Sequence, residues 1–112
     1  YLPEREIHDI SLLFLHQICR SAGRHSVFLG QSVPFDDLAN VAAQFEDVCF
    51  VSYCTTSPAS DQAQEYVDRI ERTFADTEVT FHLGGAVFKD ATGGANTTVH
   101  TDGGSLVQKI LH

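Results

Sequence analysis

The run DVCFVSYC, residues 47–54, is the feature that most constrains how this chain can fold. The run is short, almost continuously apolar and rich in residues that favour strands. A strand with this composition lies inside a parallel sheet, where helices cover both of its faces. Parallel strands need long crossover connections, and these are usually helices. The run therefore predicts an α/β fold built from βαβ units.

Helical and strand-like patterns alternate along the rest of the chain. Further strands are predicted at residues 26–30 (SVFLG), 79–85 (VTFHLGG) and 97–101 (TTVHT), with residues 93–98 (GGANTT) as a loop. Helices are predicted at residues 8–23, 34–45 and 105–111, and from Ser57-Pro58, as N-cap and first turn, to Phe74. This alternation predicts a doubly wound, flavodoxin-like or Rossmann-like, five-stranded parallel sheet. Its first strand is largely truncated, with only Tyr1-Leu2 left of it.

The first predicted helix, residues 8–23, has apolar residues on all sides. Ile10, Leu13 and Phe14 lie on one side of a helical projection, and Leu12 and Leu15 lie on the other. We therefore expect this helix to be substantially buried. Gly23 is its predicted C-cap, because glycine readily adopts the left-handed conformation that ends many helices.

Length and composition limit the function. The 112 residues form one domain, residues 1–112, and the first residue, Tyr1, suggests a fragment of a longer protein. A net charge of −8 gives no basic surface for nucleic acid or anionic membranes. No apolar run is long enough to span a bilayer, so no membrane partner is expected. Three cysteines without CxxC spacing (Cys19, Cys49, Cys54) are predicted to be buried free thiols in a cytoplasmic protein.

Three features fall at the carboxyl ends of the predicted strands, where open α/β sheets bind ligands. His8 follows the truncated first strand, Ser52 and the run CTTS end the strand at 47–54, and Gly84-Gly85 ends the strand at 79–85. Each feature alone has an ordinary structural explanation, such as a capping residue, a strand residue or a turn. Their shared position at one sheet edge favours a binding site.

The order and spacing of these residues resemble the cobalamin-binding domain. That family carries Asp-x-His-x-x-Gly, then Ser-x-Leu, then Gly-Gly at similar separations. Here the three signatures read Glu6-x-His8-x-x-Ser11, Ser52-x-Cys54 and Gly84-Gly85, and together they cover nearly the whole chain. Glutamate, serine and cysteine replace the family's aspartate, glycine and leucine.

The resemblance implies that cobalamin is bound base-off, with His8 as the lower axial ligand of cobalt and Glu6 fixing its ring. Gly84 and Gly85 would leave a slot for the displaced nucleotide tail, and the hydroxyls of Ser52 and Thr56 would bond it. Capping of a helix explains Ser57 equally well, and His16 and His82 are read as structural or surface residues. The predicted cofactor-binding residues are Glu6, Ile7, His8, Asp9, Ile10, Ser52, Cys54, Thr56, Gly84 and Gly85.

The sequence after the histidine motif, Ser11-Leu12-Leu13-Phe14, differs from the Gly-Lys-Asn typical of corrinoid enzymes and carriers. With LGQSVPFDDL (29–38) it resembles the C-terminal domain of MerR-type regulators, including light-responsive adenosylcobalamin repressors. This resemblance implies a cytoplasmic sensor and no catalysis by this domain. The cofactor would be adenosylcobalamin, and the full-length protein would be a homo-oligomer that binds DNA through a helix-turn-helix outside this chain.

Two alternatives remain open. The chain could be a corrinoid carrier, or the cobalamin-binding module of a methyltransferase or mutase. It could also be a ligand-free flavodoxin-like interaction domain, which the substitutions at Ser11 and Cys54 leave possible.

Overall fold

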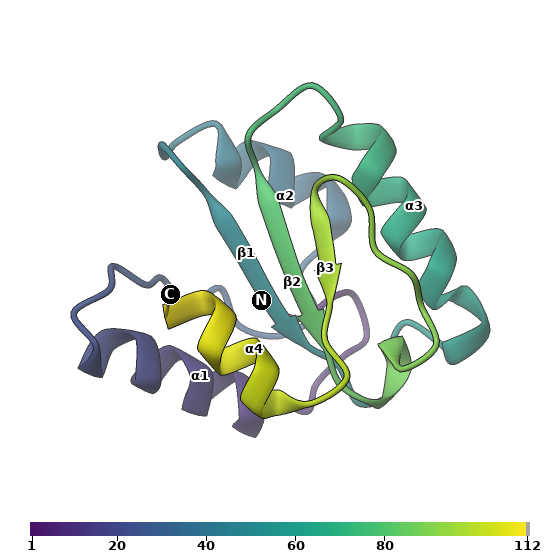
Figure 1. Cartoon of the computed structure of the whole chain (residues 1–112). Coiled ribbons are helices and arrows are strands. Elements are labelled where there is room, and N and C mark those ends of the chain that lie inside the picture. Colours follow the sequence, from purple (N-terminus) through teal and green to yellow (C-terminus); the bar gives the residue numbers. More distant parts are fainter. Residues whose placement is uncertain (112) are drawn as a thin grey trace.

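The computed structural model describes residues 1–111, which form an α/β fold around a parallel sheet (Figure 1). Three strands, β1 (Cys49–Tyr53), β2 (Thr80–Gly84) and β3 (Thr97–Val99), lie in the order β1-β2-β3. Both pairs of neighbouring strands are parallel. The predicted fold class is therefore confirmed, although the described residues contain three strands instead of five.

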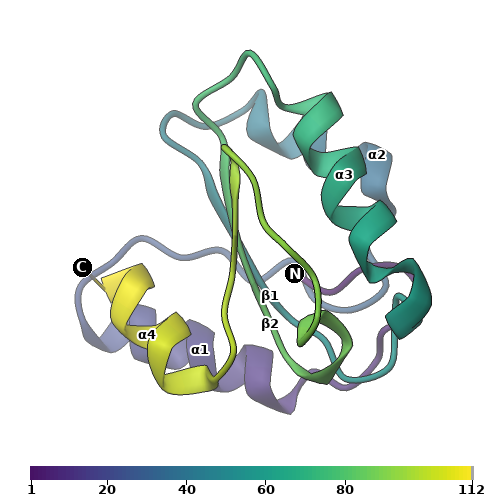
Figure 2. The same cartoon turned by 45° about the vertical axis from the view of Figure 1, so that its right-hand side comes forward.

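Helices cover both faces of the sheet, as a doubly wound fold requires. Helices α1 (Ile10–Ser21) and α4 (Gly103–Leu111) lie on one face, and α2 (Phe35–Ala42) and α3 (Ala63–Thr73) lie on the other (Figure 2). Between β2 and β3 the chain forms only the short 3-10 helix Ala86–Phe88 (η2), so the predicted loop is confirmed. Among the described helices, none has the length and apolar character needed to cross a membrane.

The core is aromatic and lies between the sheet and the pair α2 and α3. The rings of Phe50 and Phe81, neighbours across β1 and β2, stack with their centroids 4.9 Å apart. Phe74 contributes a third ring, 5.1 Å from that of Phe81. Leu38 and Ile70, which are fully buried, join them from α2 and α3. This packing explains the apolar positions predicted for β1 and for both helices.

Helix α1 ends as predicted but is less buried than predicted. Gly23 has φ +78°, and Arg24 N–H donates to the carbonyl of Cys19, which completes a Schellman motif. Leu12 and Leu15 are buried, whereas Ile10 and Phe14 are exposed. The prediction of substantial burial was wrong, because only one side of α1 faces the sheet and α4.

The predicted strand at residues 26–30 is absent, and this prediction was wrong. Residues 26–29 form no backbone hydrogen bond with any described residue. Strands need a neighbour for their backbone groups, and here the only pairing on this side is an isolated bridge between Pro3 and Val33 within the described chain. Tyr1-Leu2, the expected remnant of the first strand, is not a strand in the structure. It makes two backbone contacts: the Tyr1 nitrogen donates to the carbonyl of Val51, and Leu2 N–H donates to that of Gly30.

The helix predicted to start at Ser57-Pro58 begins later. The short 3-10 helix Ser60–Gln62 (η1) precedes α3, which starts at Ala63. The Ser57 N–H donates instead to the carboxylate of Glu6, so the residue belongs to a loop that binds this side chain. The prediction of Ser57 as an N-cap was wrong for this reason.

The three cysteines are free thiols, as predicted, but only Cys54 is buried. Cys19 is partly exposed and Cys49 is exposed. Cys49 is exposed because it starts β1, which is an edge strand among the described residues.

Candidate functional site

The carboxylate of Glu6 joins two loops at the carboxyl edge of the sheet. Glu6 precedes α1, and its side chain is fully buried. It accepts hydrogen bonds from the N–H of Thr55 (2.7 Å), the N–H and hydroxyl of Thr56 (3.1 and 2.7 Å) and the N–H of Ser57 (3.0 Å). These donors follow β1 directly. Glu6 therefore ties the loop that carries His8 to the end of the sheet.

Glu6 is held in its ionised form. Burial by itself raises the pKa of this carboxyl, but the hydrogen bonds from Thr55, Thr56 and Ser57 outweigh burial and lower the pKa below its usual value. Donors aimed at a carboxylate favour the charged form. The site thus contains a buried negative charge whose hydrogen-bond partners lie almost entirely on one loop.

His8 lies beside this charge and opens to solvent. Its Nδ1 is 3.6 Å from Glu6 Oε1, and its side chain is 54% exposed. This separation exceeds a normal hydrogen bond, so the carboxylate attracts the ring without fixing it rigidly. A carboxylate behind an exposed imidazole is the arrangement that orients histidine as a metal ligand.

Several apolar side chains close to His8 in the sequence are exposed. Ile7 is 61% exposed and Ile10 is 82% exposed. Phe14, one turn further along α1 from Ile10, is 64% exposed. Residues four apart on a helix share a face, so Ile10 and Phe14 form a continuous patch. Asp9, between His8 and the helix, makes no side-chain capping bond to α1.

Ser52 and Cys54 lie inside the fold at the end of β1, and both are fully buried. The Ser52 hydroxyl donates to the Tyr1 carbonyl at 2.6 Å and lies 3.3 Å from the Cys54 sulfur. Burial raises the pKa of the Cys54 thiol to about 12. The hydroxyl protons of Ser52 and Thr56 are thus already donated within the protein, to Tyr1 and to Glu6.

The two glycines at the end of β2 are enclosed. Gly85 has φ +99°, and a Cβ added there would lie only 2.1 Å from the Cys54 carbonyl oxygen. A Cβ at Gly84 would lie 3.2 Å from the Tyr53 ring and 3.5 Å from Leu106 of α4. In this conformation the Tyr53 and Leu106 side chains fill the space beside Gly84, where the sequence predicts a slot.

The structure brings the three predicted signatures together. Cys54 N–H donates to the Gly84 carbonyl at 2.9 Å, and the next residue along, Thr55, binds Glu6. The backbone donors of Thr55 and Ser57 were not predicted as site groups. The only sequence feature that pointed to them was the run CTTS. The same run is typical of a helix N-terminus, so the sequence did not distinguish carboxylate binding from helix capping.

A second polar cluster lies under α4, away from Glu6. His82 Nδ1 and His100 Nε2 are 3.0 Å apart, and His100 Nδ1 is 3.1 Å from the Ser105 hydroxyl. Burial lowers the pKa of both imidazoles, and for His82 the neighbouring His100 lowers it further. These contacts agree with a structural role for His82.

The fold is similar to those of two solved structures from Methanosarcina barkeri. The chain matches the methanol:cobalamin methyltransferase complex MtaBC with a TM-score of 0.71 and 15% identity, covering 98% of this chain and 44% of that one. It matches the monomethylamine corrinoid protein with a TM-score of 0.72 and 19% identity, covering 98% and 54%. This chain therefore spans about half the length of each.

Sequence comparison adds no closer relationship. No protein-family model matches the chain, and no curated protein matches it. The structural similarity establishes the flavodoxin-like fold that the alternating pattern predicted.

Proposed function

We propose that this chain is a corrinoid-binding domain in which His8 is the lower axial ligand of cobalt. The observation that carries the proposal is the pair at the carboxyl edge of the sheet: a half-exposed imidazole backed by a buried, ionised carboxylate. The fold similarity to two proteins of cobalamin and corrinoid systems supports it.

His8 offers a single imidazole, which suits a metal whose other coordination positions are filled by a cofactor. Among residues 1–111 there is no cluster of three or more His, Cys, Asp or Glu side chains able to hold a metal ion. A single imidazole is a weak site for a free cation, but it suffices for a metal already coordinated by a macrocycle. Cobalamin meets this requirement, because its corrin ring occupies the equatorial positions of the cobalt.

The surface around His8 fits the flat, largely apolar face of such a ring. Exposed Ile7 and Ile10 flank the histidine, and Phe14 extends the patch along α1. Covering these side chains removes apolar surface from water, which favours binding by about 25 cal/mol per Å². Glu6 would accept the second ring N–H of His8 and hold the imidazole in the orientation that binding needs.

The nucleotide tail would enter beside Gly84. Tyr53 and Leu106 must move for this to happen, because they fill that space here. Gly85 lies against the backbone of Cys54 and leaves no such room. We therefore assign tail binding to the gap between β2 and α4, with a displacement of α4.

Between the two biological settings considered, we propose the corrinoid carrier. Both structural neighbours belong to methyltransferase or corrinoid systems, whereas nothing in the comparisons supports the MerR regulator, the adenosyl form of the cofactor or DNA as a partner. Bound cobalamin would supply the group-transfer chemistry. The chain's own residues would hold the cobalt, orient His8 and cover one face of the ring for a partner methyltransferase.

The proposal is tested by titrating the chain with hydroxocobalamin and following the absorption spectrum. The variant His8→Ala is expected to weaken binding at least tenfold and to melt at the same temperature, since His8 is half exposed. His25→Ala, at an exposed position remote from Glu6, is the control. With histidine labelled with 15N, electron paramagnetic resonance of the cob(II)alamin complex would show the two-line coupling of a 15N ligand in the parent and not in His8→Ala, where any nitrogen coupling would come from the 14N base of the cofactor. Equal affinity of parent and His8→Ala would refute the assignment.

A further inference from the structure

Helix α4 covers the space beside Gly84 but is attached to the sheet by few buried contacts. Leu106 is its one buried side chain, and this side chain is among the atoms nearest to a Cβ added at Gly84. Helix α3 has three buried residues. Gly103 and Gly104 begin α4, and glycine is among the least favourable residues in a helix. The first half of α4 is therefore easier to displace than α3.

Two hydrogen bonds in series join this half of α4 to the sheet. His82 Nδ1, on β2, is 3.0 Å from His100 Nε2, and His100 Nδ1 is 3.1 Å from the Ser105 hydroxyl. His100 is buried and lies just beyond β3, where its backbone N–H donates to the carbonyl of Leu83 at 2.8 Å. Ser105 precedes Leu106 in α4. The three side chains thus connect two strands with the part of α4 that closes the space beside β2.

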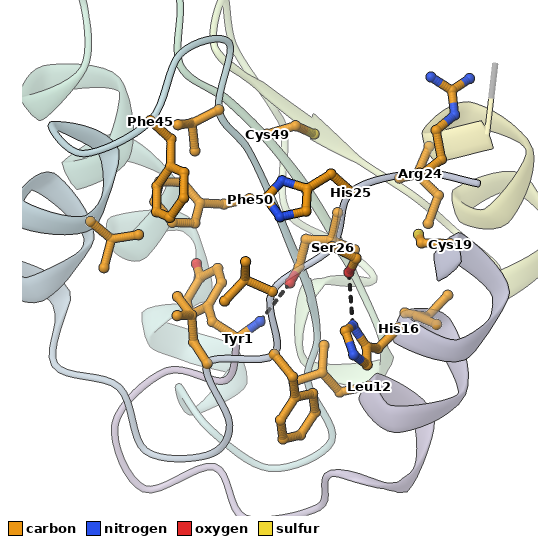
Figure 3. Close-up of a pocket in the computed structure, with 18 of the residues that line it drawn as sticks. Tyr1, Leu12, His16, Cys19, Arg24, His25, Ser26, Phe45, Cys49 and Phe50 are labelled. Carbon is orange, nitrogen blue, oxygen red and sulfur yellow. Dashed lines mark hydrogen bonds between the residues drawn. The ribbon is translucent and has the colours of Figure 1, made fainter. Parts of the chain in front are cut away.

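Helix α1 lies beside α4 on the same face of the sheet and is held in a different way (Figure 1). His16 of α1 bonds the hydroxyl of Ser26 at 2.8 Å, and both residues line a pocket beside β1 (Figure 3). The atoms nearest to a Cβ added at Gly84 belong to Tyr53 and Leu106, and not to α1. Opening the space beside Gly84 therefore requires a displacement of α4, while α1 stays in place.

We propose that His82, His100 and Ser105 form a latch that holds α4 over Gly84 until the nucleotide tail of the cofactor enters. This inference rests on the proposed function, which assigns the tail to the gap between β2 and α4. Breaking the bond between His100 and Ser105 is then part of the cost of binding. A ligand that binds only the open state loses apparent affinity in proportion to the closed fraction. Weakening the latch therefore strengthens the binding of a corrinoid that carries a tail.

The latch also responds to protons. A neutral imidazole has one N–H and one lone pair, so neutral His82 and His100 complete both hydrogen bonds in either direction. When both rings are protonated, His82 Nδ1 and His100 Nε2 each carry a proton, and the bond between them is lost. The latch is therefore weaker at acid pH than at neutral pH.

The groups around the two imidazoles set the pH of this change. Burial lowers the pKa of both rings most, Lys109 lowers both further, and Asp102 raises that of His100. The residues paired with the first histidine on β1 and β3 are a valine and a threonine, which do not titrate. Neither pKa is shifted by the further titratable side chains on β1, on α1 and after α1, which are Cys49, Tyr53, Cys19 and Arg24. The latch is thus closed at pH 7 and opens below about pH 6.5.

Ser105→Ala tests the latch, because it removes the bond to His100 at an exposed position and leaves Leu106 in place. Alanine favours a helix more than serine does, so faster opening of α4 would come from the lost bond. Ser26→Ala is the matched control, since it removes a histidine–serine bond of α1. Hydrogen exchange of the amides of residues 107–110 is measured in the ligand-free proteins, with α3 as the reference. Absorption titrations give the affinities for hydroxocobalamin and for aquacobinamide, which lacks the nucleotide tail.

Ser105→Ala is expected to speed exchange at residues 107–110 about threefold or more and to tighten hydroxocobalamin binding by a similar factor. Aquacobinamide binding should stay the same, and Ser26→Ala should match the parent in all three measurements. In the parent, exchange at residues 107–110, corrected for its intrinsic pH dependence, should rise relative to α3 between pH 7 and pH 5.5. His82→Gln should reduce this rise, because it removes one of the two titrating rings.

Unchanged exchange in Ser105→Ala would overturn the proposal. An equal gain in affinity for both corrinoids would also overturn it, because the tail would then play no part. Faster exchange without tighter hydroxocobalamin binding would separate the latch from the tail and count equally against it. If no variant bound either corrinoid, the proposed function would fail, and the exchange rates would decide by themselves whether the latch holds α4.

Discussion

The Glu6 Oε2 atom accepts two hydrogen bonds from Thr56, one from its N–H at 3.1 Å and one from its hydroxyl at 2.7 Å. The two residues are fifty positions apart in the chain. Together with Thr55 and Ser57, this contact makes Glu6 the link between the His8 loop and the sheet, and it makes the ionisation of Glu6 a determinant of stability.

Glu6→Gln is expected to destabilise the fold by roughly 1–3 kcal/mol at neutral pH, because an amide has only one acceptor oxygen and its N–H group must face at least one of the four donors, such as the Thr55 N–H that now bonds Oε1. Urea unfolding at pH 7 measures this loss. Glu4→Gln, at an exposed position two residues away, is the control and should change little.

Glu6 also gives the stability a defined dependence on pH. Its pKa is lowered in the folded state, so its contribution is fully present above the unfolded pKa, about 4.3, and is lost as pH falls through the folded value. The parent should therefore lose more stability than Glu6→Gln between pH 5 and the acid limit. Parallel curves for the two proteins would contradict this assignment.

The His82 and His100 pair predicts a second pH effect at a higher value. Both imidazoles have a lowered pKa in the folded state, with Asp102 and Lys109 among the charges that act on His100. The unfolded chain binds protons near pH 6.5 where the folded chain does not, so stability falls as pH drops below about 6.5. His82→Gln should flatten the melting temperature between pH 7 and pH 5.5, and His25→Gln should not.

Gly85→Ala is expected to cost more than 2 kcal/mol, because its Cβ would overlap the Cys54 carbonyl and its φ is positive. Gly23→Ala measures the cost of the positive φ alone, because Gly23 has φ +78° and no atom lies within 4 Å of an added Cβ. A loss of about 1 kcal/mol in the free energy of unfolding is expected. Thermal melts of the two variants compare them directly. Similar losses would show that the approach of Gly85 to Cys54 relaxes easily.

Cys54 is expected to resist thiol reagents in the native protein, because it is fully buried and its pKa is raised to about 12. Cys49, which is exposed, should react first. Titration with a chromogenic disulfide should show a fast phase that Cys49→Ser removes. Modification of Cys54 at the same rate would mean that the end of β1 opens readily.

The sequence predicted those parts of the fold whose signals are local. The apolar run at 47–54 and the spacing of Val67, Ile70 and Phe74 report burial directly, so β1 and α3 follow from them. Residues 26–30 carry an equally good strand pattern but form no strand, since pairing depends on a neighbour. A sequence pattern shows which secondary structure a segment favours. A strand forms only where a neighbouring segment can pair with its backbone groups.

The sequence predicted where the candidate site lies more accurately than it predicted which residues contact each other there. The three signatures do meet at one edge, because parallel strands end on the same side. The hydrogen-bond partners of Glu6 could not be predicted from the sequence. Ser57 resembles a helix N-cap, but its N–H donates to the Glu6 carboxylate, 51 residues away. Likewise, the exposure of Phe14 depends on which side of α1 the sheet covers.

The separation between Glu6 and its donors has a consequence for the order of folding. Contacts between residues some fifty positions apart, such as Glu6 with Thr56 and Tyr1 with Val51, form only after a long loop has closed. Helices α1 and α3 can form before that closure, but the hydrogen bonds of Glu6 behind His8 cannot. The sheet edge that carries Glu6 and His8 is therefore a late product of folding, and partly folded chains should lack the proposed binding site.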